Sequence, residues 1–249
     1  MRTFWVLVRR ELTGFFASMI AYVVVAAVLL LLGISFLVLI EALREPVDVP
    51  LTELFHETYF FWLILLLGTP VITMRSLALE KSAGTYETLM TAPVGDAQVV
   101  LAKFTANLLF VMLTWLPLLG CLLLVRHFTH DASPPDWGAW AAMYLGILLL
   151  SAVYVAMGLF ASALTHNQII AAIVALVLGV GLFTLSFLGQ LRPAASEWQA
   201  ALFRQLAPVE HMRDFARGVV DVAQVVFHAS VAALFLFVTT KVVESRRWK

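Results

Sequence analysis

The polar stretch Arg75–Lys103 carries charges of both signs between two long apolar segments. Gly84 is placed to act as an N-cap, and Glu87, three residues further on, can bind the free backbone N–H groups of a first helical turn. Pro93 cannot continue a helix and marks its end. The spacing therefore predicts a helix of one or two turns, Thr85–Thr91, with defined ends that a second protein could bind.

The lysines exclude a phosphate-binding loop, because that motif places a glycine directly before its lysine. The four lysines of the sequence instead follow Glu80, Ala102, Thr240 and Trp248. We therefore expect no ATP hydrolysis by this chain and no cofactor in it. Energy from ATP would have to come from a partner.

Two patterns resemble metal sites but lack necessary features. The HExxH pattern that begins at His56 has Phe60 in place of its second histidine, which excludes a zincin site. His127, His130 and Asp131 could share one helical turn, but the two prolines that follow them disfavour a helix there. We therefore expect no metal site.

Ser162 and His166 lie four residues apart at the end of an apolar segment, a spacing that permits contact between a nucleophile and its base. The sequence contains no GxSxG elbow and no candidate oxyanion hole. An intramembrane hydrolase therefore stays only as a minor alternative, and we expect no catalytic residues.

The elements that would hold these residues are strongly apolar. Hydrophobic residues form 62% of the chain and charged residues 13%, against about 45–50% and 25% in soluble domains. The sequence predicts an all-α polytopic membrane protein, with residues 1–249 as a single transmembrane domain. Nucleic-acid binding is excluded, because the net charge is zero and no basic block occurs. The six predicted spans are residues 20–40, 59–74, 104–125, 139–164, 168–189 and 222–240.

The N-terminal segment Thr3–Phe16 predicts an amphipathic helix. It places Phe4, Val8 and Leu12 on one helical face and the arginines on the other. This pattern is typical of a helix that lies in the membrane interface.

The connections contain residues that begin or interrupt helices. Pro70 near the end of span 2 predicts a kink, and Asp96 is expected to cap the helix that follows the central stretch. The segment Gln190–Asp221 mixes charged and apolar residues. It predicts a pair of short helices at the membrane surface, broken at Pro208.

Lys and Arg counts predict the orientation of the chain. Counted over short connections, ten lie on the side of the two termini and the central stretch, and two lie on the other. We therefore expect both termini and the central stretch in the cytosol.

Small residues recur at helical spacing on spans 4 and 5, where they let helices approach closely. Packing within one chain explains them better than a dimer seam. No ionisable side chain other than Cys121 and tyrosine is expected well inside a span, which disfavours an ion-coupled transporter. The small residues are Ala152, Ala156, Gly158, Ser162, Ala171, Ala175 and Gly179.

The segment Thr69–Phe104, TPVITMRSLALEKSAGTYETLMTAPVGDAQVVLAKF, resembles the connection between the second and third spans of ABC-2 type transporter permeases. It is most similar to the subfamily that includes the gliding-motility-associated permeases. The segment Phe215–Trp248, FARGVVDVAQVVFHASVAALFLFVTTKVVESRRW, resembles the end of the same subfamily. With the order of the spans, the resemblance covers essentially the whole chain.

The resemblance implies that the central helix is a cytosolic coupling helix, which docks into a cleft of a separate ATPase subunit. Residues implied on or beside it are Glu80, Lys81, Gly84, Thr85, Glu87 and Leu89. Tyr86, Leu89 and Met90 would fill an apolar groove of the ATPase, Glu87 and Glu80 would pair with its basic residues, and Pro93 would end the helix.

The resemblance further implies a transporter with two permease halves, identical or related, and an ATPase dimer that binds ATP and Mg. An external helical hairpin would join spans 5 and 6. We expect a lipid-embedded subunit of the bacterial cytoplasmic (inner) membrane that exports an amphiphilic or lipid-linked substrate. The alternatives are a non-transporting membrane scaffold or mechanotransmission subunit and the intramembrane hydrolase.

Overall fold

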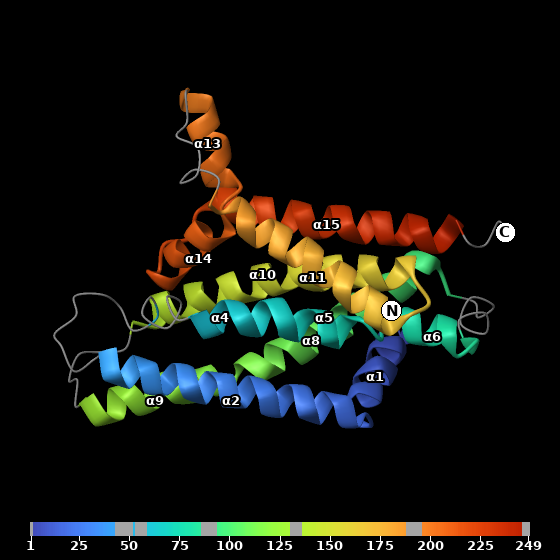
Figure 1. The fold of residues 1–249 in the computed structure, drawn as a ribbon, viewed down its shortest axis with the longest axis horizontal. Coiled ribbons are helices and arrows are strands. Elements are labelled where there is room, and N and C mark those ends of the chain that lie inside the picture. The colour runs from blue at the N-terminus through green and yellow to red at the C-terminus, as the bar shows by residue number, and fades with distance from the viewer. Residues whose placement is uncertain are drawn as a thin grey trace.

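The computed structural model describes residues 2–42, 52, 59–85, 94–129, 136–187 and 196–245. These residues contain helices and no strand, which confirms the predicted all-α class. Figure 1 shows the long helices running side by side, with the N-terminal helix turned across one end of the bundle.

The helices follow one another along the chain with few breaks. Their bounds are α1 (Arg2–Phe16), α2 (Met19–Ala42), α4 (Tyr59–Leu63), the π-helical η1 (Ile64–Gly68), α5 (Thr69–Thr73), α6 (Ala78–Ser82), α8 (Asp96–Trp115), α9 (Pro117–Thr129), α10 (Trp137–Leu164), α11 (Gln168–Leu185), α13 (Glu197–Gln205), α14 (Pro208–Ala216) and α15 (Val222–Ser245).

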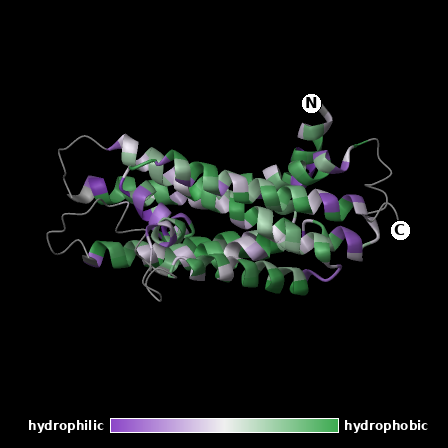
Figure 2. Cartoon of the chain, turned by 90° about the horizontal axis from the view of Figure 1, so that it is seen from above, coloured by the Kyte–Doolittle hydropathy of each residue, from purple (hydrophilic) through white to green (hydrophobic). Residues whose placement is uncertain are grey.

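Six segments of the described residues are long and apolar enough to cross a membrane, as predicted. Figure 2 shows hydrophobic residues along most of the bundle and hydrophilic residues mainly toward its ends. Three segments extend well beyond the predicted ranges, because the second continues to Ser82, the third begins at Asp96 and the sixth ends at Ser245. The six segments are Met19–Glu41, Phe60–Ser82, Asp96–His127, Trp137–Leu164, Gln168–Leu185 and Val222–Ser245.

Helix α10 lies at the centre of the bundle. It contacts α15, α11, α14, α8 and α5. In its most apolar stretch of 18 residues, 72% is buried inside the protein. Met143, Ile147, Val155 and Leu159 have no exposed surface. Helix α10 therefore holds α5, α8, α11, α14 and α15 together.

The second span changes its hydrogen-bond pattern just before Pro70, where a kink was predicted. Proline cannot donate a backbone hydrogen bond, and the preceding residues form the π-helical turn η1 before α5 begins. The Thr69 hydroxyl donates to the Leu65 carbonyl at 2.7 Å. A side chain thus satisfies an acceptor where the regular backbone pattern changes.

The N-terminal helix α1 forms as predicted and lies against α8. Val8 is buried together with Ala102 and Ala106 of α8, and Phe4 and Leu12 pack beside them. This confirms the predicted apolar face. In the structure that face is covered by another helix of the same chain.

Asp96 does not cap α8, so that prediction was wrong by one residue. The N-cap is Gly95, which is extended, and its carbonyl accepts from the Val99 N–H at 3.1 Å. Asp96 is the first helical residue. There its carboxylate still lies at the positive end of the helix dipole.

The segment between the last two spans contains two short helices, α13 and α14, and Pro208 begins the second. This agrees with the predicted break. Figure 1 shows α13 projecting away from the long helices, while α14 packs toward α10.

The small residues of α10 and α11 serve contacts within the chain. A Cβ at Gly158 would overlap Thr73 of α5, and one at Gly179 would lie 2.9 Å from Cε1 of Tyr154. The Tyr154 hydroxyl also donates to the Gly179 carbonyl at 3.2 Å. These contacts agree with the preference for packing within one chain.

Gly158→Ala should therefore lower the free energy of unfolding by about 1–3 kcal/mol, the usual cost of overpacking. The added methyl group forces α5 away from α10. Gly181→Ala in α11 is the matched control, because nothing lies within 4 Å of its Cβ position, and an unhindered alanine favours a helix. Unfolding of the detergent-solubilised protein measures the free energy of unfolding of both variants. An equal loss of stability in the two variants would contradict the close contact between Gly158 and Thr73.

Candidate coupling site

Glu80 and Lys81, two of the residues expected to couple the chain to a partner, lie in α6, which follows a turn at one end of the bundle. The structure describes Glu80 and Lys81 in α6, and then Gly84 and Thr85. The rest of the predicted coupling helix lies outside the described residues. This applies to Tyr86, Glu87, Leu89, Met90 and Pro93.

The start of α6 is attached to α10 through the hydroxyl of Ser162. The backbone N–H groups of Leu77 and Ala78 each donate to Ser162 Oγ at 3.0 Å, and Oγ donates to the Met74 carbonyl at 3.1 Å. The first N–H groups of a helix have no acceptor within that helix. Here a fully buried side chain of another helix supplies the acceptor, so it fixes the turn that leads into α6.

These hydrogen bonds argue against Ser162 as the nucleophile of an intramembrane hydrolase. A serine hydroxyl has one proton and two acceptor sites, and Ser162 uses all three on the backbone around α6. The contact with His166 that the spacing permits is therefore not needed to satisfy Ser162. Its geometry is that of a structural residue.

Lys81 fixes the other half of α6 to the same helix. Its side chain is buried, and Nζ donates to the carbonyl of Ala163. Ala163 lies in the last turn of α10, where carbonyls lack intrahelical donors and the helix dipole favours a cation. Lys81 and Ser162 thus hold α6 at both ends.

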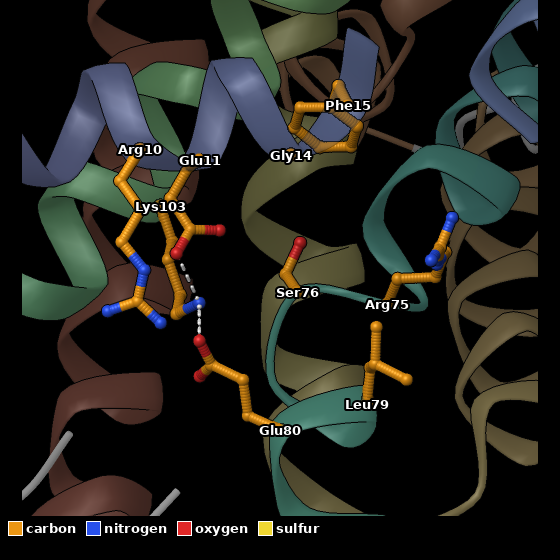
Figure 3. Close-up of a pocket in the computed structure, with 9 residues that line it drawn as sticks. All are labelled: Arg10, Glu11, Gly14, Phe15, Arg75, Ser76, Leu79, Glu80 and Lys103. Carbon is orange, nitrogen blue, oxygen red and sulfur yellow. Dashed lines mark hydrogen bonds and ion pairs between the residues drawn. The ribbon is translucent and has the colours of Figure 1, made fainter. Parts of the chain in front are cut away.

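Lys103 of α8 joins three elements through ion pairs (Figure 3). Its Nζ lies 2.9 Å from Glu11 Oε1 in α1 and 2.7 Å from Glu80 Oε1 in α6. Lys103 is 1% exposed, and the side chains of Glu11 and Glu80 are 19% and 13% exposed. A charge buried to this degree requires partners, so this cluster holds α1 and α6 on α8.

A cavity of about 200 Å³ opens beside the ion pairs. The Arg75 guanidinium lies at its edge and donates to the Ser18 hydroxyl at the junction of α1 and α2. Ser76 is bound from the opposite side, because Asn107 Nδ2 of α8 donates to its hydroxyl at 2.9 Å. The residues that line the cavity are Arg10, Glu11, Gly14, Phe15, Arg75, Ser76, Leu79, Glu80 and Lys103.

Gly84 has a positive φ of +72°, in the left-handed region in which helices commonly end and which glycine adopts without strain. The helix that Gly84 was predicted to cap, Thr85–Thr91, lies outside the described residues after Thr85, so the N-cap role stays a prediction. Gly84 follows the end of α6, and the Thr85 hydroxyl reaches back to the Glu80 carbonyl at 3.4 Å.

The structure gives Glu80 a partner within the chain. The sequence suggested a basic residue of a second protein, whereas its carboxylate binds Lys103. The sequence analysis also missed the roles of Lys103 and Ser162 in holding α6. A lysine and a serine at the ends of apolar segments are the signal that could have found them, since polar groups at such positions need buried partners.

One expectation about the spans is wrong, because His228 lies inside α15 and is buried. Its Nδ1 lies 2.7 Å from the Gln224 carbonyl, and its ring lies 5.3 Å from that of His211 in α14. Burial lowers the pKa of His211 below its ordinary value, so that imidazole is neutral near pH 7. The pair links α14 to the last span.

Within the described residues, no group of three or more His, Cys, Asp or Glu side chains could hold a metal ion. Of the weak candidate set in the sequence, His127 lies in α9. His130 and Asp131 lie outside the described residues.

Six apolar segments, in a chain whose described residues form helices and no strand, define a multi-pass membrane protein. The polar cluster around α6 lies at the end of the second of these segments and includes Lys103 of the third. Residues 58–240 match the family model described as ABC-2 family transporter protein. This match covers more than half of the sequence, and the chain therefore belongs to the ABC-2 transporter family. No curated protein matches the sequence.

Proposed function

We propose that this chain is the permease subunit of an ATP-driven exporter and that α6, with the segment after it, receives the movement of a separate ATPase. Membership of the ABC-2 family supports a permease subunit with an ABC ATPase partner. The proposed cargo is an amphiphilic or lipid-linked molecule. The proposed location is the bacterial cytoplasmic membrane, with both termini in the cytosol.

The attachment of α6 is the observation that carries this proposal. Ser162, Lys81 and the Lys103 ion pairs connect α6 to α10, α8 and α1. A displacement of the residues after Gly84 would therefore move packed membrane helices rather than a loose connection. Coupling requires such a link, because an ATPase can shift the permease only through contacts that differ between two states.

The cargo class follows from the surface of the spans. Most side chains in the six spans are apolar, whereas a path for small ions or sugars normally contains polar or ionisable groups. We propose that the cargo keeps its apolar part in contact with lipid or moves between two permease halves. These halves are two copies of this chain or one copy with a related permease, and the gliding-motility-associated permeases are the proposed subfamily.

A membrane scaffold or mechanotransmission subunit is the second candidate. The same attachment of α6 would transmit force without moving any cargo. Such a protein would bind its ATPase while no substrate crossed the membrane. Transport in sealed vesicles separates the two candidates.

Glu87→Arg should weaken binding of the ATPase by at least about tenfold, which corresponds to ~1.4 kcal/mol. The reason is that the substitution places a like charge against the proposed basic residues of the partner. Titration of the purified permease in lipid discs with the ATPase measures the affinity. Glu197→Arg in α13, at the start of the external hairpin, is the matched charge control, and retained affinity of Glu87→Arg would remove this contact from the proposal.

A further inference from the structure

A second cavity, of about 170 Å³, lies between α2 and α8 next to the end of α1. Val25, Leu29, Phe110 and Leu113 are among the residues that line it. Its wall includes Thr114, but that hydroxyl already donates to the Val111 carbonyl at 2.6 Å. A cavity with so few free polar groups does not hold ordered water. Its chemistry fits a hydrocarbon chain.

The depth of this apolar cavity matches one leaflet of a bilayer. Its lining on α2 runs from Ala21, two residues after the helix begins, to Leu29. Eight residues of helix rise about 12 Å, and half of the hydrocarbon core is about 15 Å thick. The cavity therefore covers the part of the membrane that one acyl chain occupies.

The polar cavity described above lies at the mouth of the apolar one. Phe15 lines the polar cavity and the next residue, Phe16, lines the apolar one. The rings of Phe15 and Phe110 stack at 4.8 Å between their centroids. Along α8, Lys103 and Phe110 are seven residues apart and share a helix face. The two cavities thus follow one another from the helix ends into the membrane.

The polar cavity has an excess of positive charge. Arg10, Arg75 and Lys103 line it against Glu11 and Glu80, three basic residues against two acidic ones. Lys103 binds both carboxylates. Arg10 also attracts the Glu80 carboxylate, and Arg75 donates to Ser18. A guanidinium has five N–H donors, so each arginine has donors left for phosphate oxygens, which guanidinium groups suit.

We propose that one anionic glycerophospholipid binds at the junction of α1 and α2, with its phosphate in the polar cavity that Arg10 and Arg75 line and one acyl chain in the apolar cavity between α2 and α8. The bound lipid fills the space beside the ion pairs of Lys103 and supports the position of α1. It is a resident lipid of the leaflet on the side of α1, distinct from any exported cargo.

Native mass spectrometry of the full chain, titrated with phosphatidylglycerol and with phosphatidylcholine, tests the proposal. Each basic residue near an anionic lipid contributes about fivefold in affinity. We expect one phosphatidylglycerol to bind at least fivefold more tightly than phosphatidylcholine. Arg10→Gln should remove about fivefold of that affinity and leave phosphatidylcholine unchanged, whereas Arg9→Gln on the same exposed turn should change neither.

A second pair of variants tests the acyl chain. Leu113→Trp fills the apolar cavity and should weaken binding of both lipids by about tenfold or more. Leu109→Trp is the matched control, because Leu109 is 45% exposed, close to the 43% of Leu113, and does not line the cavity. Both variants add a tryptophan at a similarly exposed position of α8. A difference in lipid affinity between them is therefore due to filling of the cavity.

Equal affinity of the two lipids for the unmodified chain would overturn the proposal. So would equal lipid affinities of Arg10→Gln and Arg9→Gln, or of Leu113→Trp and Leu109→Trp. A third contrary result is binding of glycerol 3-phosphate as tightly as phosphatidylglycerol. The last result would assign the site to a free phosphate. The experiment needs no ATPase, so its failure leaves the proposed transport function untouched.

Discussion

Lys103→Met should lower the free energy of unfolding by about 3–5 kcal/mol, the usual cost of removing one partner of a buried ion pair. The substitution keeps the length of the side chain but leaves Glu11 and Glu80 close together without their cation. We expect α1 and α6 to separate from α8. Unfolding in detergent gives the stability, and proteolysis near residue 15 reports the release of α1.

Two comparisons test whether loss of the ion pairs causes the destabilisation of Lys103→Met. Adding Glu11→Gln and Glu80→Gln to Lys103→Met removes the unpaired charges and should recover most of the lost stability. Lys241→Met breaks an exposed pair with Glu244 in α15, which contributes about 0–1 kcal/mol. If Lys103→Met lowered the free energy of unfolding no more than Lys241→Met, the ion pairs of Lys103 with Glu11 and Glu80 would not stabilise the fold significantly.

Ser162→Ala should destabilise the start of α6, at about 1–3 kcal/mol for each buried N–H left without a partner. The Leu77 and Ala78 N–H groups would both lose their acceptor. Because α6 would no longer be fixed to α10, we also expect stimulation of the partner ATPase to fall by more than the change in its binding. Unfolding and ATP hydrolysis measure the two effects separately.

Ser151→Ala provides an unusually close control for Ser162→Ala. Both serines lie in α10 and neither has exposed surface, but the Ser151 hydroxyl has no hydrogen-bond partner among the residues that the structure describes. Its removal should be neutral or slightly stabilising. Similar losses for the two variants would mean that the hydrogen bonds of Ser162 do not hold α6.

The fold was largely predictable because it depends on patterns that are local in sequence. Apolar runs predicted all six spans, and Pro208 correctly predicted the break between the two short helices α13 and α14. The ends of spans 2 and 3 were less predictable. The charge of Lys103 predicted the edge of a span. Its ion pairs with Glu11 and Glu80, which are 92 and 23 positions away in the sequence, allow it to lie buried in the middle of a helix.

The contacts within the candidate site were not predictable from the sequence. The sequence indicated the segment around Glu80 and Lys81, but both side chains bind residues of distant helices, Lys103 and Ala163. Such partners depend on how helices pack, which no spacing in the sequence gives. The positive φ of Gly84, just after α6, was also not predicted from the sequence.

The most direct test is to co-express the chain with a candidate ABC ATPase subunit from the same organism, purify the complex through a tag on the permease and measure ATP hydrolysis in lipid discs. The proposed function predicts a stoichiometric complex with vanadate-sensitive turnover that falls sharply with Glu87→Arg. A permease that purifies alone, or a complex whose turnover is indifferent to Glu87→Arg, would contradict coupling through the segment after α6.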